Sequence, residues 1–158
     1  MNNEELNELI EESIALELNA AALYKIFSQA VPADADFWWQ LHLEERSHAT
    51  LIRAARDSFF KNGQFPRDLV AESIEELKAS NQKLRENITH FISTPPTRES
   101  AALAALALEI EIGEQHYTRF MQKEAENSIE TVFQKLNRDD VEHERRIRER
   151  FENIFSEA

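Results

Sequence analysis

The sequence contains no cysteine, and it has only two glycines and four prolines among 158 residues. Without cysteine the chain can form no disulfide, no thiolate zinc site and no cysteine-bound iron–sulfur centre. Glycine and proline dominate β-turns, so their scarcity in a chain rich in Glu, Leu and Ala favours helices over strands. We therefore expect an all-α protein.

Long apolar runs are missing as well. No stretch reaches the length of a transmembrane helix, and the start of the chain, residues 1–5, lacks the basic and apolar regions of a signal peptide. Thirty acidic residues against 18 basic ones give a net charge of -12, which disfavours nucleic acid and anionic membranes and favours cations. The length predicts one domain covering residues 1–158. We expect a cytoplasmic protein with no nucleic-acid or membrane partner.

Apolar residues recur every three or four positions over five stretches, which is the period of an amphipathic helix. This pattern predicts helices at about 3–30, 34–62, 68–92, 98–126 and 128–156. The first link is so short that the first two helices must fold back as an antiparallel hairpin. Asp34 or Asp36 is the expected N-cap of the second helix, and Thr97 that of the fourth. The long third helix suits a crossover between two parallel helices.

Six polar side chains interrupt these apolar stripes at positions that face a core: Glu17, Glu45, His48, Glu109, Asp140 and His143. Four of them form two acid-x-x-His pairs, and residues three apart lie on one face of a helix. A buried carboxylate without a partner costs several kcal/mol, roughly, so such positions imply a partner or a metal ion. We interpret these six residues as metal ligands.

The chain also looks internally duplicated. The segment 15–18, Ala-Leu-Glu-Leu, recurs at 107–110 as Ala-Leu-Glu-Ile, and a His follows each Glu after a further 31 and 34 residues. Two such hairpins, packed about a pseudo-twofold axis, would bring four carboxylates and two imidazoles together. Carboxylates bridge cations, and imidazole suits iron. The expected cofactor is therefore a pair of iron ions, with manganese or mixed metals as alternatives.

Other acids in these helices have a simpler structural interpretation. Helical phase turns Glu111 and Glu114 away from Glu109, which makes them solvated acids. For Asp140 the alternative to a ligand is a surface acid near the middle of its helix.

The remaining rings are expected to pack rather than to bind metal. His42 and His116 are more typical of packing or supporting residues than of ligands. Tyr24 and Tyr117 suit a core, although either hydroxyl could bond a ligand carboxylate across the bundle. Trp38 and Trp39 fit packing or an interface.

These features resemble the rubrerythrin and ferritin-like family over almost the whole chain. The resemblance is most specific in two motifs of the first hairpin, Glu17-x-x-Ala20-x-x-x-Tyr24 and Leu41-x-x-Glu44-Glu45-x-x-His48-Ala49-x-Leu51. It implies a ferritin-like four-helix bundle made of two hairpins and a long helical crossover. It also implies a di-iron centre with the ligands Glu17, Glu45, His48, Glu109 and His143.

The family implies an oxidoreductase that reacts with dioxygen or hydrogen peroxide. This sequence departs from the family in three places: it has no cysteine-bound iron domain, Asp140 stands where the family has Glu, and Ile112 replaces a further carboxylate. Because the cysteine-bound iron domain is missing, an external electron donor protein is expected as a partner. We also expect a homo-oligomer, a dimer or larger. The alternative is an iron-storage or metal-binding bundle without turnover.

Overall fold

The computed structural model describes the backbone of residues 3–59, 74–116 and 128–156. Side chains are described over the same ranges except at positions 58, 59, 112–116, 128–130, 132, 133, 136, 137, 139 and 140. Every segment of regular secondary structure in these ranges is a helix, which confirms the expected all-α class. None of the described helices is both long and apolar enough to cross a lipid bilayer.

Five long helices and two short ones make up the described chain. Their bounds are Asn3–Ala30 for α1, Pro32–Asp34 for the 3-10 turn η1, Ala35–Phe59 for α2, Ile74–Ser93 for α3, Arg98–His116 for α4, Ser128–Arg150 for α6 and Glu152–Ser156 for α7. The expected helical residues 60–62, 68–73 and 117–126 lie outside the described ranges.

Thr97 caps α4, as its sequence position predicts. The Thr97 Oγ1 atom accepts a hydrogen bond from the backbone N–H of Ser100 at 3.1 Å, and Ser100 Oγ accepts one from the backbone N–H of Thr97 at 2.9 Å. This reciprocal pair satisfies two backbone donors that the first turn of a helix leaves without intrahelical partners. The local sequence therefore determines where α4 begins.

The last helix is not continuous to residue 156, contrary to expectation. It breaks at Phe151, where α6 ends and α7 begins. Phe151 is buried and stacks on Trp38 with ring centroids 5.3 Å apart, while the guanidinium of Arg98 lies 4.7 Å from the Phe151 ring centroid. The chain turns here with a bond from the Ile154 N–H to the Phe151 carbonyl.

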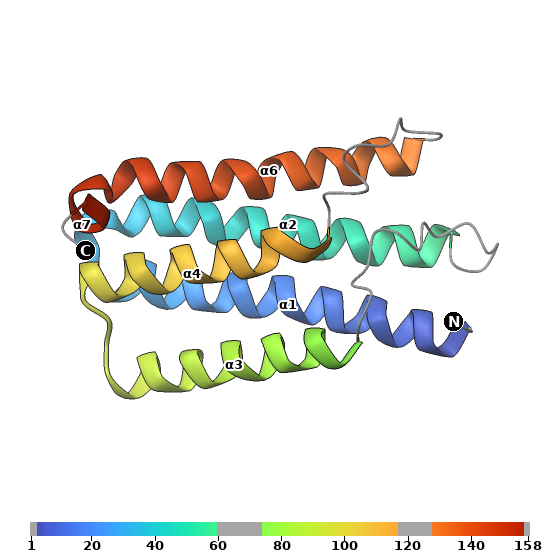
Figure 1. Ribbon diagram of the computed structural model, residues 1–158, viewed down its shortest axis with the longest axis horizontal. Helices are drawn as coiled ribbons and strands as arrows, with labels where there is room; N and C mark the ends of the chain where they lie inside the picture. The colour runs from blue at the N-terminus through green and yellow to red at the C-terminus, as the bar shows by residue number, and fades with distance from the viewer. Residues whose placement is uncertain (1–2, 60–73, 117–127, 157–158) are drawn as a thin grey trace.

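The long helices run side by side along the length of the molecule (Figure 1). The α1 helix packs antiparallel to α2, α4 packs antiparallel to α6, and α3 packs on α1. Following the colours of Figure 1, α2 and α4 run in the same direction, while α3, at the lower edge beside α1, runs in the opposite direction. The middle of the molecule is thus lined by α1, α2, α4 and α6.

Aromatic side chains fill one end of this arrangement, where α1 ends and α2 begins. Trp38 is fully buried and stacks on Tyr24 at a centroid separation of 5.7 Å. Phe27 meets Trp38 edge to face at 5.2 Å, and Phe91 brings α3 against Phe27 at 5.3 Å. Such pairs contribute beyond their buried area, so this end is firmly packed.

A buried carboxylate links three helical segments at the same end. Asp34, one of the two expected N-caps of the second helix, is 2% exposed and binds two arginines: its Oδ2 accepts a bond from Arg98 Nε at 2.9 Å, and its Oδ1 lies 3.0 Å from an Arg150 guanidinium nitrogen. One acid thereby joins the turn before α2 to the start of α4 and the end of α6. We call these three residues the Asp34 clamp.

The Asp34 clamp should stabilise the fold measurably. Replacing Asp34 with Asn keeps the volume but removes the negative charge, so we expect the free energy of unfolding to fall by about 1.5–3 kcal/mol, the range for hydrogen bonds to charged groups. Urea denaturation measures it. The matched control is Asp57→Asn, because Asp57 is exposed and its pairing with Arg56 is on the surface; its effect should stay within about 0.5 kcal/mol. Equal losses in both variants would contradict the clamp.

Candidate metal centre

The middle of the four central helices contains a cluster of buried acids and histidines. Glu17 comes from α1, Glu45 and His48 from α2, Glu109 from α4 and His143 from α6, and none is more than 3% exposed. These are five of the six residues that the sequence predicts as metal ligands. Side chains so polar are seldom buried unless they are paired or bind a metal.

The cluster consists of two triads that share one residue. Glu17, Glu45 and His48 form the first, and Glu45, Glu109 and His143 form the second. In each triad, one possible ligand atom per residue lies within 4.8 Å of the others, a spacing able to hold a metal ion. Since Glu45 belongs to both, two ions bound here would be neighbours.

The two oxygens of Glu45 face different histidines. Glu45 Oε2 lies 3.4 Å from His48 Nδ1, and Glu45 Oε1 lies 2.8 Å from His143 Nδ1. His48 Nδ1 is 3.7 Å from Glu17 Oε2, and His143 Nδ1 is 3.6 Å from Glu109 Oε1. The two imidazole rings lie almost parallel, with centroids 5.6 Å apart. Both histidines therefore direct Nδ1 towards the carboxylates.

Electrostatics couples these groups strongly. Burial alone would lower the pKa of His48, but Glu17 and Glu45 outweigh it and raise that pKa to about 11. Burial opposes the charged form of His143 too, yet contacts with Glu109, Glu44 and Glu45 raise its pKa far above the usual range. In the metal-free protein both imidazoles are therefore cations at neutral pH.

The two acids of the second triad shift in opposite directions. Burial favours the neutral form of Glu45, but contacts with Glu17, His143 and His48 hold its pKa well below the usual range. Burial, together with the charge of Glu45, raises the pKa of Glu109 despite the nearby His143. The site therefore favours bound protons, which compensate its negative charge in the metal-free protein.

Tyr24 supports the second triad from α1. Its ring is buried in the core, and its hydroxyl donates a hydrogen bond to Oε1 of Glu109, so both roles expected of this tyrosine are confirmed. His42 packs as expected: its Nδ1 lies 2.7 Å from the carbonyl oxygen of Ala21, and its ring lies against Trp39. Trp38 is buried in the core, whereas Trp39 is 44% exposed.

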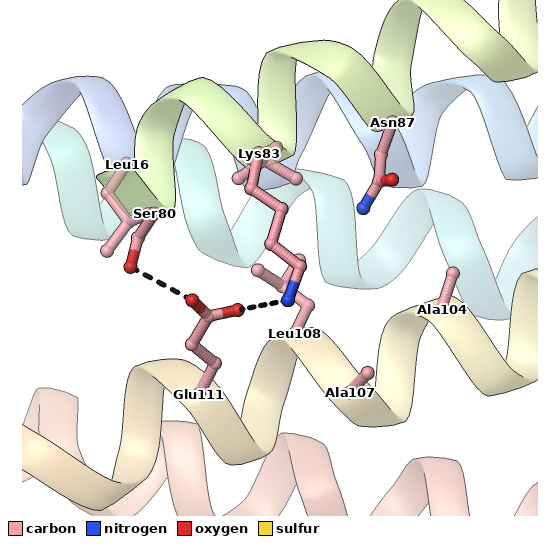
Figure 2. Close-up of a pocket in the computed structure, with 9 residues that line it drawn as sticks. Leu16, Ser80, Lys83, Asn87, Ala104, Ala107, Leu108 and Glu111 are labelled. Atoms are coloured by element: carbon pink, nitrogen blue, oxygen red, sulfur yellow. Dashed lines mark hydrogen bonds and ion pairs between the residues drawn. The ribbon is translucent and has the colours of Figure 1, made fainter. Parts of the chain in front are cut away.

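Glu111 is on the other side of α4. Figure 2 shows its carboxylate turned towards α3, where Oε1 accepts a bond from Ser80 Oγ at 3.0 Å and Oε2 lies 3.7 Å from Lys83 Nζ. These groups line a cavity of about 60 Å³ between α1, α3 and α4, with Leu16 and Leu108 among its apolar walls. Glu111 therefore belongs to this surface cavity and not to the triads, in agreement with its helical phase.

The structure leaves other expected positions untested. Asp140 lies on α6, one turn before His143, but its side chain is outside the described part of the structure. The same holds for Glu114 and His116 on α4, and Tyr117 lies outside the described ranges altogether.

One pair beside the cluster was not anticipated. Arg146 donates to both carboxylate oxygens of Glu44, each at 2.9 Å, and Glu44 Oε1 lies 3.6 Å from His143 Nε2. Burial would raise the pKa of Glu44, but His143 and Arg146 lower it to about 2. A signal was present in the sequence, because Arg146 follows His143 by one helical turn.

No protein-family model, curated protein sequence or solved structure matches this chain. The fold and the site thus define its class by themselves. It is an all-helical protein with two buried Glu/His triads that are able to hold metal ions.

Removing the shared residue should affect both triads. We expect the unaltered chain to hold about two divalent ions, as dinuclear carboxylate sites do, and Glu45→Ala to hold almost none. The matched control is Glu111→Ala, since Glu111 is an α4 acid engaged with Ser80 and Lys83. Elemental analysis after anaerobic Fe(II) loading and desalting measures the content. Equal metal loss in the two variants would show that the triads do not bind the metal.

Metal binding should release protons. The pKa of His48 is about 11 in the metal-free protein and that of His143 is also strongly raised, so both must lose a proton when Nδ1 binds an ion. We expect about two protons released per chain on saturation with Zn²⁺ near pH 7, and tighter binding as the pH rises through the neutral range. A pH-indicator dye in weak buffer reports the release. His48→Ala should release about one proton fewer, and zinc binding without proton release would refute this account.

The raised pKa of His48 also affects the stability of the metal-free fold. Whereas metal binding should become tighter as the pH rises, this stability should decrease. A raised pKa stabilises the folded state fully below the unfolded value of 6.5, and this contribution is lost as the pH rises towards 11. The free energy of unfolding of the metal-free protein should therefore decline from pH 7 to pH 10, as measured by urea denaturation. A rise over that interval would contradict the assignment.

Proposed function

We propose that the chain is a ferritin-like di-iron protein that reacts with dioxygen or hydrogen peroxide. The observation that carries the proposal is Glu45, whose two oxygens face the histidines of two different buried triads. A carboxylate in that position can bridge two metal ions, and imidazole and carboxylate together suit iron or manganese. The helix directions in Figure 1 support the proposal, because two antiparallel pairs connected through α3 match a ferritin-like bundle.

The residues fit a pair of divalent ions in number and charge. The described triads supply three carboxylates and two neutral imidazoles. Three negative charges against the four positive charges of two divalent ions leave one positive charge, which Asp140 would neutralise if it is the sixth ligand. Oε2 of Glu109 is buried and finds no hydrogen-bond donor among the described residues, as expected of an oxygen reserved for a cation.

The chemistry that two ferrous ions would supply is the transfer of two electrons, enough with two protons to convert one hydrogen peroxide molecule into two water molecules. The protein's own part is to hold and orient. Glu45 keeps the two halves of the site together, and Tyr24 orients Glu109 through its hydroxyl. The packed helices keep these groups out of bulk water, which strengthens every charge interaction between them.

The electrons for a second turnover must come from outside the site. The chain has no cysteine that could bind an iron relay, so we propose a separate electron donor protein. Without it, the reaction should stop once the site is oxidised.

Rapid mixing tests the proposed reaction. Protein loaded anaerobically with about two Fe(II) per chain is mixed with hydrogen peroxide, and absorbance follows Fe(III). We expect one oxidation event per site, faster than for free Fe(II), and then a stop until a reductant is added. The matched control is Glu45→Ala, which should oxidise iron no faster than the buffer. Iron oxidation no faster than in buffer in the unaltered chain would favour a metal that only supports the fold, and uptake of many irons per chain would favour storage.

A further inference from the structure

The Glu44–Arg146 pair lies on the outer side of His143, opposite the triads. One guanidinium nitrogen of Arg146, Nη2, donates to both oxygens of Glu44 at 2.9 Å each, so these charge-assisted bonds restrain the carboxylate. Glu44 and Arg146 are 29% and 26% exposed, whereas His143 is fully buried. The pair therefore separates His143 from solvent.

The two nitrogens of His143 face different acids. Nδ1 points to Glu45 and Glu109, while Nε2 lies 3.6 Å from Glu44 Oε1. A neutral imidazole that binds a metal through one nitrogen keeps its proton on the other, and the acceptor near that second nitrogen decides which tautomer forms. Glu44 places a carboxylate oxygen on the Nε2 side, within ion-pair distance, so it favours the tautomer that keeps the proton on Nε2 and leaves Nδ1 available to the metal.

Glu44 needs a restraint to have this effect. It is only half-buried and is the sequence neighbour of Glu45, so a free carboxylate could turn to water. Arg146 opposes that movement with two hydrogen bonds, and its positive charge compensates the negative charge of Glu44. The pair thus orients His143 without adding net charge to the site.

We propose that Arg146 and Glu44 are positioning residues that hold the Nδ1 atom of His143 towards Glu45 and Glu109, and that they set the metal affinity of this triad. The inference rests on the proposed function only in that a metal ion occupies the triads; it requires no oxidation chemistry. Since α6 carries both His143 and Arg146, one helix supplies the ligand and the anchor of its orientation.

Zinc is the probe, because it accepts imidazole and carboxylate ligands and has no redox chemistry. Metal-free protein is titrated with Zn²⁺, and ¹⁵N NMR of the histidine side chains reports which nitrogen binds zinc and which carries the proton. In the unaltered chain we expect zinc on Nδ1 and the proton on Nε2 for His143. In Arg146→Gln we expect one of the two zinc equivalents to bind 10–100-fold more weakly, roughly the effect of losing such a supporting partner.

Matched variants separate positioning from general damage. Arg148→Gln removes an arginine of the same helix that is 51% exposed and bonds Glu144, so it should leave both equivalents unchanged. Arg146→Lys keeps the positive charge and a donor nitrogen, and it should restore part of the affinity that Arg146→Gln loses. Glu44→Ala should weaken the same zinc equivalent as Arg146→Gln does. It should also weaken the NMR signal of the proton on Nε2 of His143. Melting of each metal-free variant verifies folding, and if Arg146→Gln does not fold, Arg146→Lys and Glu44→Gln carry the comparison.

Three results would overturn the inference: equal weakening of both zinc equivalents in Arg146→Gln, no weakening of either, or zinc bound at Nε2 of His143 in the unaltered chain. The proposed function can fail separately. If zinc binds with the expected difference between variants but the iron-loaded protein does not oxidise, the positioning role stands and the di-iron chemistry is wrong. An unaltered chain that binds no zinc would overturn both.

Discussion

The structure depends on the burial of three carboxylates and two imidazoles between helices. Removing such groups from water costs several kcal/mol each, roughly, unless opposite charge compensates them. Here compensation is mutual: each histidine lies within 4 Å of two acids of its own triad, and Glu45 serves both. The acids raise the proton affinity of the histidines, so in the metal-free protein the site carries its own cations.

The end of the molecule around Asp34 maintains the alignment that this site needs. A helix rises about 1.5 Å per residue, so a shift of α6 by one residue along α2 would separate His143 from Glu45. The Asp34 clamp joins the start of α2 to α4 and α6, and the stacking of Trp38 on Phe151 fixes the same junction. The packing of one end thereby supports the geometry of the middle.

Several acids in the described part of the chain pair with arginine or lysine, as Glu44 pairs with Arg146, Glu111 with Lys83 and the buried Asp34 with Arg98. Glu17, Glu45 and Glu109 are buried and meet histidine and one another. These three acids concentrate negative charge where a small cation could reach several oxygens. The overall charge of -12 therefore says less about metal binding than the position of these three residues does.

Sequence alone was sufficient for the helical class and for which face of each helix carries Glu17, Glu45, His48, Glu109 and His143. Both follow from local periodicity, because the phase of a residue on its helix depends only on its neighbours in the chain. Tertiary structure decided the rest: that Glu45 is the shared residue, that Arg146 holds Glu44 beside His143, that Asp34 binds Arg98 and Arg150, and that the last helix breaks at Phe151. Each of these depends on atoms that meet across 64 or more residues of sequence, or on ring packing between helices, and no local pattern specifies such meetings.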